Sequence, residues 1–425
     1  MSEIWPTVVL AVIFFVIIGL ILTFMILLVK AKLVSQELIT LTINDELKKE
    51  AESGTTLLNT LLAQGFGIPS PCGGKATCLQ CKVRVVEGGG EILQTDRSTF
   101  KPKELKDGWR LSCQCKIRQD MKILLPPSAI TLNEFEARVV SNKNVATFIK
   151  ELVIEVPQDT ELEYIPGDYM QIKIPPYVTN TTDWKKTIDP KYFPDWEMYG
   201  MFGNEIKYEP IEDVIRAFSM ASHPLEGKLL KFNVRIATPP MKNNRLKKGI
   251  PWGIASSYIF SLDEGDKVLL SGPFGESHMV DDDRELIFLI GGAGSSFGRS
   301  HILDLFEAKK TKRKVTLWYG ARSLRENIYE EDFKRLDENY DNFTYHVVLS
   351  EPLPEDFNNG WPKDDPLKTN FVYKAFEKGQ LEEMETPEDN LYYVCGPPMH
   401  NKSVMKLLDD YGVLRDNIIL DDFGS

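Results

Sequence analysis

Histidine and cysteine are both scarce in this chain of 425 residues, which contains five histidines and six cysteines. No histidine lies near the segment in which the cysteines gather, and the five show no spacing typical of zinc ligands. Six cysteines in so long a chain do not make the framework of a small disulfide-stabilised domain. The cysteines are therefore expected to be reduced, which fits a cytoplasmic environment.

Basic residues are too few to balance the acidic ones, and the formal net charge is −12. This balance argues against a nucleic-acid partner, because binding phosphates requires a basic surface. Internal repeats and low-complexity tracts are absent as well. At ~100–200 residues per domain, the length predicts about three domains.

Charge is missing altogether from residues 6–29, which read PTVVLAVIFFVIIGLILTFMILLV. As an α-helix this run would be about 36 Å long, enough to cross a ~30 Å hydrocarbon core. A signal peptide is disfavoured, because Glu3 precedes the run and no small-residue cleavage site follows it. A buried core helix is rarely so uniformly apolar. Lys30 and Lys32 follow the run and no Lys or Arg precedes it, so the positive-inside rule predicts a single transmembrane anchor with the remaining chain in the cytoplasm.

Four cysteines have a spacing typical of a [2Fe–2S] cluster rather than of zinc or a disulfide framework. They are Cys72, Cys78, Cys81 and Cys113, in the pattern C-x5-C-x2-C with a distant fourth residue. Four soft thiolates saturate the two irons of such a cluster. Gly73 and Gly74 allow the backbone to curl close to the inorganic sulfides. The five-residue gap is longer than that of plant-type ferredoxins and is similar to that of the ferredoxins of bacterial and vertebrate electron-transfer systems.

The fourth ligand has a rival, because Cys115 stands two residues beyond Cys113. We prefer Cys113, since LSCQ (residues 111–114) resembles the ferredoxin pattern at the returning ligand. Cys115 is interpreted as a small buried residue.

Three regions follow the predicted anchor. Residues 31–130 combine short strands with one helix and predict a small mixed sheet of the β-grasp type, with the cluster loop at its edge. Residues 131–283 contain runs of alternating β-branched residues and predict an antiparallel β-barrel, with the polar, aromatic-rich residues 175–210 as a surface insertion. Residues 284–425 alternate strands with helices and predict a doubly wound α/β domain with a parallel sheet. The predicted domains are 1–30, 31–130, 131–283 and 284–425, and the predicted fold class is multidomain, α+β and α/β.

The last region opens with a short apolar strand over Leu286–Ile290. A glycine-rich turn follows, and the spacing then predicts an amphipathic helix over Phe297–Phe306. Further strands are expected at Val315–Tyr319, Tyr345–Leu349 and Tyr392–Cys395. Nucleotides bind such sheets at the carboxyl ends of the strands.

Arg216, Phe218 and Ser219 stand in the strand-like segment RAFS, which resembles the R-x-Y/F-S motif of the ferredoxin–NADP⁺ reductase superfamily. The resemblance implies that Arg216 pairs with the flavin pyrophosphate, since a forked guanidinium suits phosphate oxygens. It also implies that Phe218 lies against the isoalloxazine and that the Ser219 hydroxyl bonds near flavin N5. A plain strand is the commoner explanation of such a tetrapeptide by itself.

A second segment, WGIASS at residues 252–257, resembles the other pyrophosphate loop of the same superfamily. Gly253, Ser256 and Ser257 supply small residues and hydroxyls at the start of a helix, where free N–H groups bind anions. The two segments, in this order within a β-rich region, predict FAD.

Gly291, Gly292 and Gly294 follow an apolar strand and precede a helix, which is the context of a dinucleotide-binding turn. The segment departs from the superfamily pattern, because Ile290 replaces the usual first glycine and SSFG occupies residues 295–298. A tight turn that merely needs small residues is the alternative. We predict that the three glycines contact the NADH pyrophosphate.

CGPP at residues 395–398 matches the C-terminal nicotinamide motif of the superfamily. The match implies that Cys395 packs beside the hydride-transfer position, with Gly396 and Pro397 near the nicotinamide. Phe423 resembles the terminal aromatic that covers the flavin until nicotinamide displaces it. Arg322, at the end of a predicted strand, could meet an NADP phosphate.

Together these segments resemble the NADH-oxidising F subunits of the Na⁺-translocating NADH:quinone oxidoreductases. The likeness covers nearly the whole chain and is carried by PCGGKATC-x-x-C, GWRLSCQ, RAFSMAS, YGARS, CGPPM and the DDFG ending. It favours NADH over NADPH, and it implies FAD and a [2Fe–2S] cluster. It also implies electron entry into a sodium-pumping complex that reduces ubiquinone, and other membrane subunits of that complex as partners. The implied location is the bacterial inner membrane, with one membrane-crossing helix and the soluble domains in the cytoplasm.

Two other functions remain open. A membrane-tethered NADH-dependent reductase of an oxygenase or desaturase would share the three domains. A non-enzymatic electron carrier would follow if the altered glycine loop no longer binds NADH. The first predicts electron delivery without sodium dependence, and the second predicts a flavin that NADH fails to bleach.

Overall fold

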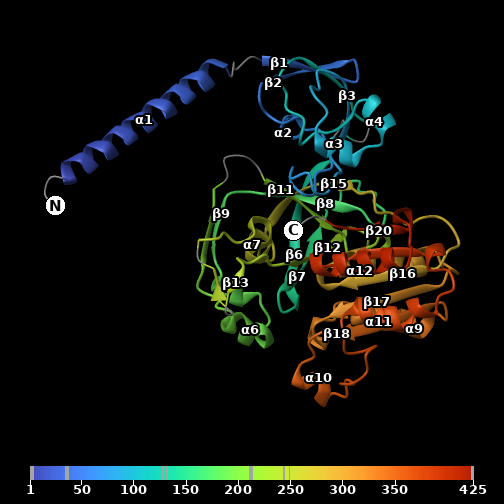
Figure 1. The fold of residues 1–425 in the computed structure, drawn as a ribbon. Helices are drawn as coiled ribbons and strands as arrows, with labels where there is room; N and C mark the ends of the chain where they lie inside the picture. The colour runs from blue at the N-terminus through green and yellow to red at the C-terminus, as the bar shows by residue number, and fades with distance from the viewer. Residues whose placement is uncertain are drawn as a thin grey trace. The chain divides into compact units, whose positions relative to one another are not determined.

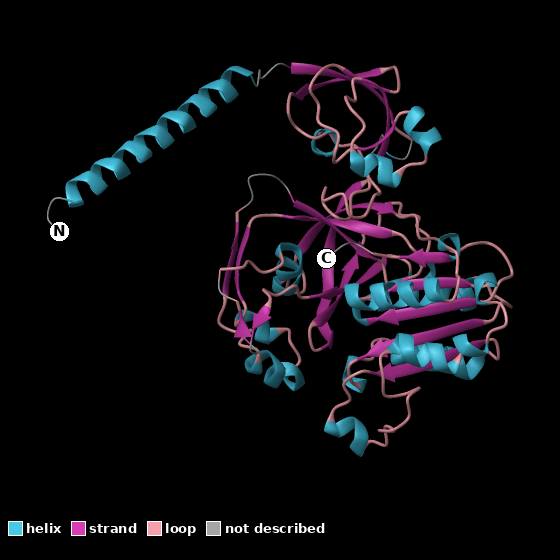
Figure 2. Ribbon diagram, in the orientation of Figure 1, coloured by secondary structure: helices cyan, strands magenta, loops and turns pink. Residues whose placement is uncertain are grey.

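The computed structural model describes residues 4–33, 38–126, 129, 133–209, 214–242, 245–247 and 249–422. It divides the chain into two compact units, one of residues 1–68 and 79–131, and one of residues 69–78 and 132–425. Figure 1 follows the chain from α1 to β20, and Figure 2 separates helices from strands.

The first unit begins with the long helix α1 (Ile4–Leu33), which contains the charge-free run. Among the residues whose side chains are described, no helix combines the length and hydropathy of a membrane span. The transmembrane helix expected for residues 1–30 is thus not confirmed by the structure.

A five-stranded mixed sheet forms the body of the first unit. Its order is β2-β1-β5-β3-β4, with β1 and β5 parallel and the other neighbours antiparallel. Thr56 caps the N-terminus of α2 through a hydroxyl that accepts from the Asn59 N–H at 3.2 Å. The elements are β1 (Leu38–Ile43), β2 (Leu47–Glu52), α2 (Leu57–Ala63), β3 (Lys82–Glu87), α3 (Gln94–Thr99), α4 (Pro102–Lys106), β4 (Trp109–Leu111) and β5 (Met121–Leu124).

The second unit contains a six-stranded antiparallel sheet in the order β11-β8-β15-β6-β7-β12. Its strands are β6 (Glu134–Ala146), β7 (Ile149–Glu155), β8 (Tyr169–Ile174), β11 (Val214–Ser219), β12 (Leu229–Arg235) and β15 (Lys267–Phe274). The helix α7 (Ile254–Ser261) packs against the apolar side of this sheet. Just beyond β11, the Ala221 N–H donates to the Lys231 carbonyl in β12 at 2.7 Å. The edge strands β11 and β12 are not paired along their length in the described residues, so the predicted antiparallel β-barrel is not confirmed.

The segment predicted as a surface insertion has a core of its own. Trp184, Tyr192, Trp196 and Met201 are almost fully buried and pack with Phe260 of α7. The sequence did not predict this core, because the aromatic residues lack the periodicity of a regular element and still bury one another. Its elements, with the nearby hairpin β13–β14, are β9 (Tyr177–Asn180), α6 (Phe193–Met198), β10 (Glu205–Tyr208), β13 (Met241–Lys242) and β14 (Arg245–Leu246).

A five-stranded, fully parallel sheet follows in the order β18-β17-β16-β19-β20. Its strands are β16 (Leu286–Gly291), β17 (Val315–Ala321), β18 (Phe343–Leu349), β19 (Leu391–Cys395) and β20 (Ile418–Leu420). The chain order runs outward from β16 in one direction and then restarts with β19 on the other side. The point between β16 and β19 is therefore a topological switch point, where ligands bind beside the carboxyl ends of the strands.

Helices cover both faces of the parallel sheet. Phe288 and Ile290 point toward α8 and α9, whereas Ile287 and Leu289 point toward α11 and α12. Figure 1 shows α11 and α12 on one face. The helices are α8 (Ser295–Leu303), α9 (Glu330–Asn339), α10 (Pro354–Asn358), α11 (Val372–Gly379) and α12 (Pro398–Asp410).

The helix predicted as amphipathic over residues 297–306 is buried on all sides. Every residue of α8 is buried, and a π-helical turn over Asp304–Ala308 continues it. The amphipathic prediction was wrong, because the polar side chains of α8 do not face water. Asn233 of β12 bonds two of them, and Arg299 contacts the loop that precedes β12.

Candidate flavin, nicotinamide and iron–sulfur sites

The predicted flavin and nicotinamide motifs meet at one carboxyl group. Ser219, at the end of β11, donates from Oγ to Oδ2 of Asp421 at 2.8 Å. The Sγ of Cys395, at the end of β19, lies 3.9 Å from the same oxygen. Asp421 follows β20, and its N–H donates to the Val394 carbonyl at 3.0 Å. The structure thus brings together two predicted residues from segments far apart in the sequence.

Asp421 is the main site residue that the sequence analysis missed. It is 7% exposed. Burial, reinforced by the neighbouring Asp422, raises the pKa of Asp421 to about 7, although the bonds from Ser219 and Cys395 favour the carboxylate. The DDFG ending predicted a role for Phe423 only, because no local sequence pattern indicates that Asp421 is buried. Phe423 itself lies outside the described residues.

Cys395 is suited to packing rather than to nucleophilic attack. Burial and the nearby Asp421 and Asp422 raise the pKa of its thiol well above the usual value, so the sulfur stays protonated. Gly294 lies directly against it, because a Cβ at that position would collide with the Cys395 carbonyl and lie 3.0 Å from Sγ. The glycine loop after β16 and the end of β19 therefore touch at the switch point.

The other predicted nicotinamide residues lie at the same switch point, beside the carboxyl ends of β16 and β19. Gly291 ends β16, and Gly292 has the left-handed φ of +55° that opens the turn into α8. Gly396 and Pro397 follow β19 and lead into α12. A dinucleotide at this switch point meets the N-termini of both helices, whose first N–H groups lack partners within the helix.

Ser295 and Ser296, in the part of the glycine loop that departs from the superfamily pattern, bond to strand β12 of the antiparallel sheet. The Asn233 N–H of β12 donates to Ser296 Oγ at 3.0 Å, and its Nδ2 donates to Ser295 Oγ at 2.9 Å. One turn later, Arg299 pairs with Glu226 at 2.7 Å and with Asp332 at 2.7 Å. The residues that depart from the superfamily pattern thus tie the parallel-sheet domain to the antiparallel sheet.

The predicted flavin residues on β11 occupy the edge of the antiparallel sheet. Phe218 is partly buried against its apolar core. Arg216 is partly exposed, and its Nη1 donates to the Ile215 carbonyl at 2.8 Å. Gln171 on β8 is opposite Ala217, between these two residues, and neither of its buried amide atoms has a hydrogen-bond partner in the described part of the chain. An orphaned buried amide beside this strand fits a site built to receive a polar ligand.

The second flavin segment begins α7 as expected. Gly253 is its N-cap, and a Cβ there would lie 2.5 Å from the Cβ of Ala237, so the close approach requires glycine. Ser256 Oγ accepts from the Ala237 N–H at 3.0 Å and so holds α7 to the segment that follows β12. The buried Ser257 hydroxyl meets no partner with good geometry in the described residues.

A cavity of about 530 Å³ opens beside the start of α7. Trp252 and Ile254, which flank the N-cap glycine, line it together with Tyr177 and Tyr208 of the inserted hairpin. Burial raises the pKa of Tyr177 to about 12, with the nearby Ser257 hydroxyl opposing the shift, and the Tyr177 hydroxyl donates to the Ile254 carbonyl at 2.6 Å. Planar aromatic walls next to a helix N-terminus suit an aromatic ring joined to phosphate.

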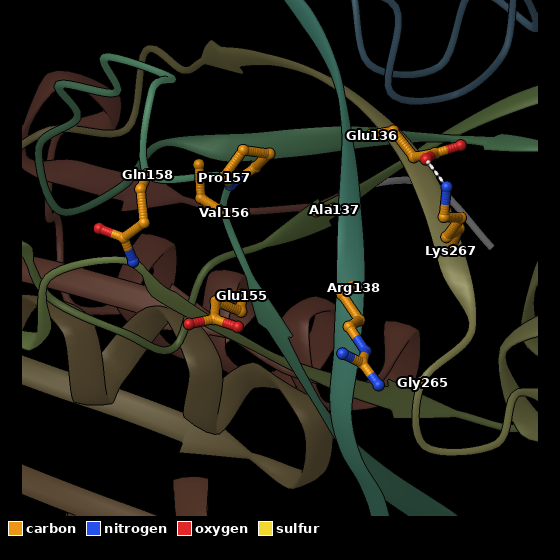
Figure 3. Close-up of a pocket in the computed structure, with 9 residues that line it drawn as sticks. All are labelled: Glu136, Ala137, Arg138, Glu155, Val156, Pro157, Gln158, Gly265 and Lys267. Atoms are coloured by element: carbon orange, nitrogen blue, oxygen red, sulfur yellow. Dashed lines mark ion pairs between the residues drawn. The ribbon is translucent and has the colours of Figure 1, made fainter.

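A second cavity, of about 360 Å³, lies on the other side of the antiparallel sheet, between β6, β7 and β15. Figure 3 shows its charged lining, in which Lys267 and Glu136 pair at 2.6 Å. Arg138 and Glu155 complete the charged groups. No predicted flavin or nicotinamide residue lines this cavity.

In the second unit, the free thiols of Cys72 and Cys78 are in contact. Their Sγ atoms are 3.3 Å apart. The Cys78 thiol, the N–H groups of Cys78 and Thr77, and the Thr77 hydroxyl lower the pKa of Cys72 to about 4 despite its burial. Along the loop, Gly73, Gly74 and Ala76 have left-handed φ angles. In this loop the Thr77 and Cys78 N–H groups bond to the Cys72 sulfur, and the strain at Ala76 is typical of a functional loop.

In the first unit, the free thiols of Cys81 and Cys113 are in contact. This contact, together with burial, raises the pKa of Cys81 above its usual value. Gln114 donates to Cys113 Sγ at 3.6 Å. Cys115 instead turns toward the Gly89 carbonyl, 3.8 Å from its sulfur, and burial raises its pKa to about 11.

Within the described chain, no group of three or more His, Cys, Asp or Glu side chains has a metal-binding arrangement. The set of four ligands therefore remains a prediction. The donors fit an iron–sulfur cluster in kind, since all four are thiols, as soft iron ligands must be.

Residues 41–118 match the family model of the 2Fe-2S iron-sulfur cluster binding domain, and residues 288–405 match that of the oxidoreductase NAD-binding domain. The F subunit of the Na(+)-translocating NADH-quinone reductase of Chlamydia caviae is 56% identical over 97% of this chain and 96% of its own length. This chain belongs to that family. The F subunit of the Neisseria gonorrhoeae reductase is 44% identical and covers 98% of the chain and all of its own length. Family membership therefore extends from the N-terminal segment to the last strands.

Among solved structures, the Amycolatopsis cytochrome P450 reductase GcoB covers 91% of this chain and 98% of its own, with a TM-score of 0.59 and 20% identity. A ferredoxin reductase of carbazole 1,9a-dioxygenase has a TM-score of 0.55 and 21% identity, over 91% of this chain and 99% of its own. At this identity the likeness concerns the fold. The chain thus shares its fold with reductases whose names place them outside its own family.

Proposed function

We propose that this chain is the electron-entry subunit of a Na⁺-translocating NADH:quinone oxidoreductase. It takes a hydride from NADH at the switch point and passes electrons singly, through a [2Fe–2S] cluster, to partner subunits that reduce ubiquinone. The observation that carries the proposal is Asp421, which joins Ser219 of the flavin motif to Cys395 of the nicotinamide motif.

FAD supplies the conversion between a two-electron hydride donor and a one-electron acceptor. Around it, Arg216 and the α7 start, with Gly253, Ser256 and Ser257, would hold the pyrophosphate. Phe218 would lie against the ring. The aromatic cavity beside α7 supports this placement.

The protein's part in hydride transfer is orientation. Gly291, Gly292 and Gly294 bring backbone close to the dinucleotide phosphates, and Gly396 and Pro397 do so near the nicotinamide. Cys395 stays a neutral thiol that packs beside the reacting carbon. Ser219 and Asp421 place a hydroxyl and a titratable carboxyl where a proton is needed when the flavin is reduced.

Cys72, Cys78, Cys81 and Cys113 are the proposed cluster ligands. The two thiol pairs and the left-handed loop backbone support this set, and the orientation of Cys115 toward Gly89 supports its exclusion.

The finer proposal on location is attachment to the bacterial inner membrane through residues 6–29, with the soluble domains in the cytoplasm. The segment has no charge. Within it, Phe14, Phe15, Leu20 and Phe24 are each more than 60% exposed. Because water solvates such side chains poorly, a lipid or a partner helix is needed around them. Expression of the full chain and of residues 31–425 tests this, since only the full chain should sediment with membranes after a high-salt wash.

The electron path is tested on the full chain in detergent, loaded with FAD, iron and sulfide. Addition of NADH should bleach the flavin absorbance and then produce the EPR signal of a reduced [2Fe–2S] cluster. Cys72→Ala should abolish the EPR signal and leave the bleaching intact. A wild-type flavin that NADH fails to bleach would show that the chain is an electron carrier without NADH oxidation.

A further inference from the structure

His400 occupies the switch point of the parallel sheet although no predicted site includes it. It is the third residue of α12, which starts directly after the CGP segment. A Cβ at Gly396 would lie 2.6 Å from its Cδ2, and a Cβ at Gly291 would lie 3.5 Å from its Nδ1. The imidazole therefore stands between the glycines that follow β19 and end β16, the two strands on either side of the crevice.

One nitrogen of His400 is committed to the protein. Its Nε2 lies 3.1 Å from the carbonyl oxygen of Leu289, in the middle of β16. A carbonyl oxygen only accepts, so Nε2 must carry the hydrogen. Burial lowers the pKa of His400, which keeps the ring neutral at physiological pH. In the neutral ring Nδ1 then has a lone pair and no hydrogen.

The free lone pair faces the side of the crevice where the glycine turn begins. Nδ1 has no hydrogen-bond partner among the residues that the structure describes. Rotation of the ring would break the bond from Nε2 to the Leu289 carbonyl. The fold thus holds a hydrogen-bond acceptor of fixed direction at the place where a dinucleotide crosses from one strand end to the other.

The chemistry of NADH decides which part of it suits this acceptor. Phosphate oxygens are acceptors themselves and would repel the lone pair, whereas ribose hydroxyls and the carboxamide NH₂ donate. The half of NADH that reacts must lie near Cys395 and the Ser219–Asp421 pair, and His400 is adjacent to this end of the crevice through Gly396. We propose that His400 is an NADH-binding residue whose Nδ1 accepts a hydrogen bond from a donor on the nicotinamide-riboside half of the dinucleotide. This inference rests on the proposed function.

Two substitutions separate a role of His400 in binding NADH from a merely structural role, in which its ring only fills the space between Gly291 and Gly396. His400→Gln keeps a donor for the Leu289 carbonyl and removes the Nδ1 acceptor. His400→Phe keeps the ring volume and removes both nitrogens. Lys406→Ala, on the same helix at an exposed position, serves as the matched control.

Calorimetry on the FAD-loaded full chain in detergent should give a Kd for NAD⁺ about three- to tenfold higher in His400→Gln, the loss of one hydrogen bond. ADP, which lacks the nicotinamide riboside, should bind all three variants and wild type alike. ADP-ribose should share the loss if a ribose hydroxyl is the donor, and should bind normally if the carboxamide is. In wild type labelled with ¹⁵N-histidine, the His400 Nδ1 resonance should move on addition of NAD⁺ but not of ADP.

An unchanged NAD⁺ affinity in His400→Gln, with weaker binding in His400→Phe alone, would show that the ring only fills the space between Gly291 and Gly396. An equal loss of ADP affinity in His400→Gln would likewise overturn the inference. A wild-type chain that binds no NAD⁺ and is not bleached by NADH would overturn the proposed function and this inference with it. Normal bleaching by NADH with an unaffected His400→Gln variant would overturn the inference alone.

Discussion

Asn233 and Ser296 link two domains of the second unit through a backbone bond, in which the Asn233 N–H donates to Ser296 Oγ at 3.0 Å. The Asn233 side chain adds a bond to Ser295 and accepts one from the Tyr329 hydroxyl at 3.1 Å. Ser295 and Ser296 belong to the stretch that departs from the superfamily pattern. These two serines therefore couple the position of the nicotinamide crevice to β12 of the antiparallel sheet.

Asn233→Ala should slow hydride transfer more than it weakens binding of the dinucleotide. The substitution removes the side-chain bond to the buried Ser295 hydroxyl, at a cost of about 1–3 kcal/mol, whereas the Tyr329 hydroxyl keeps its bond to Glu151 at 2.6 Å. We expect the rate of flavin bleaching at saturating NADH to fall about tenfold, with the Kd for NAD⁺ changed less than threefold. Stopped-flow absorbance measures the rate, and the exposed substitution Asn339→Ala is the control. Equal losses in rate and affinity would contradict a positioning role.

Asp421→Asn should remove a pH dependence that the wild type shows. The folded pKa of Asp421 is raised to about 7 by burial. Below the usual Asp pKa of about 4 the carboxyl is protonated in both folded and unfolded chains. Between about pH 4 and 7 the folded state binds the extra proton, so this group's contribution to stability is lost as the pH rises through that window.

Urea unfolding at several pH values tests the shift directly. The difference in unfolding free energy between Asp421→Asn and wild type should grow between pH 4 and 7 and level off above 7. The rate of flavin bleaching should also lose any inflection near pH 7 in the variant. A difference that stays constant from pH 4 to 8 would mean that folding does not raise the pKa of Asp421.

The elements that the sequence predicted best are those with strong local patterns. The apolar run Leu286–Ile290 became the central strand β16 because only a strand buried on both faces is so continuously apolar. The charged strand β2 escaped prediction, since LKKEAE has no apolar alternation, and it lies at a sheet edge where charge is tolerated.

The site was predictable only where a motif marked it. Cys395 and Ser219 came from short motifs, whereas Asp421, Asn233 and His400 take their places through contacts between residues about 60 to 200 positions apart. No local pattern encodes a contact of that kind. The single histidine that meets the crevice looked like the other four in the sequence.

Arg299→Met should destabilise the second unit strongly. Arg299 is almost fully buried, and its guanidinium pairs with Glu226 and Asp332 at 2.7 Å each. Removing the guanidinium takes a charged partner from two partly buried carboxylates, although Lys231 still pairs with Glu226 at 2.6 Å, and we expect a cost of about 1–3 kcal/mol. Burial alone would raise the pKa of Glu226, but the bonds and charges of Arg299 and Lys231 lower it to about 2.

The pH dependence of that loss identifies its cause. A carboxyl with a lowered folded pKa contributes stability that is present above its unfolded pKa of about 4.5 and is lost as the pH falls toward 2. The destabilisation by Arg299→Met, measured by urea unfolding, should therefore shrink between pH 5 and 3. The surface substitution Arg335→Met is the control, since Arg335 is 49% exposed and its pairs with Glu307 and Asp332 are screened by water. A loss independent of pH would point to packing of the Arg299 stem instead.

Cys113→Ser and Cys115→Ser decide the fourth cluster ligand. Cys113 is paired with Cys81 and receives a bond from Gln114, whereas the Cys115 sulfur lies against the Gly89 carbonyl. Serine at a ligand position replaces a soft thiolate with a harder oxygen, so Cys113→Ser should lose the cluster or shift its visible absorbance and EPR g-values. Cys115→Ser should keep wild-type spectra, because the Cys115 sulfur points to the Gly89 carbonyl rather than to another thiol. Normal spectra in Cys113→Ser together with altered spectra in Cys115→Ser would reverse the assignment, and flavin bleaching by NADH in both variants shows that the nicotinamide and flavin sites remain intact.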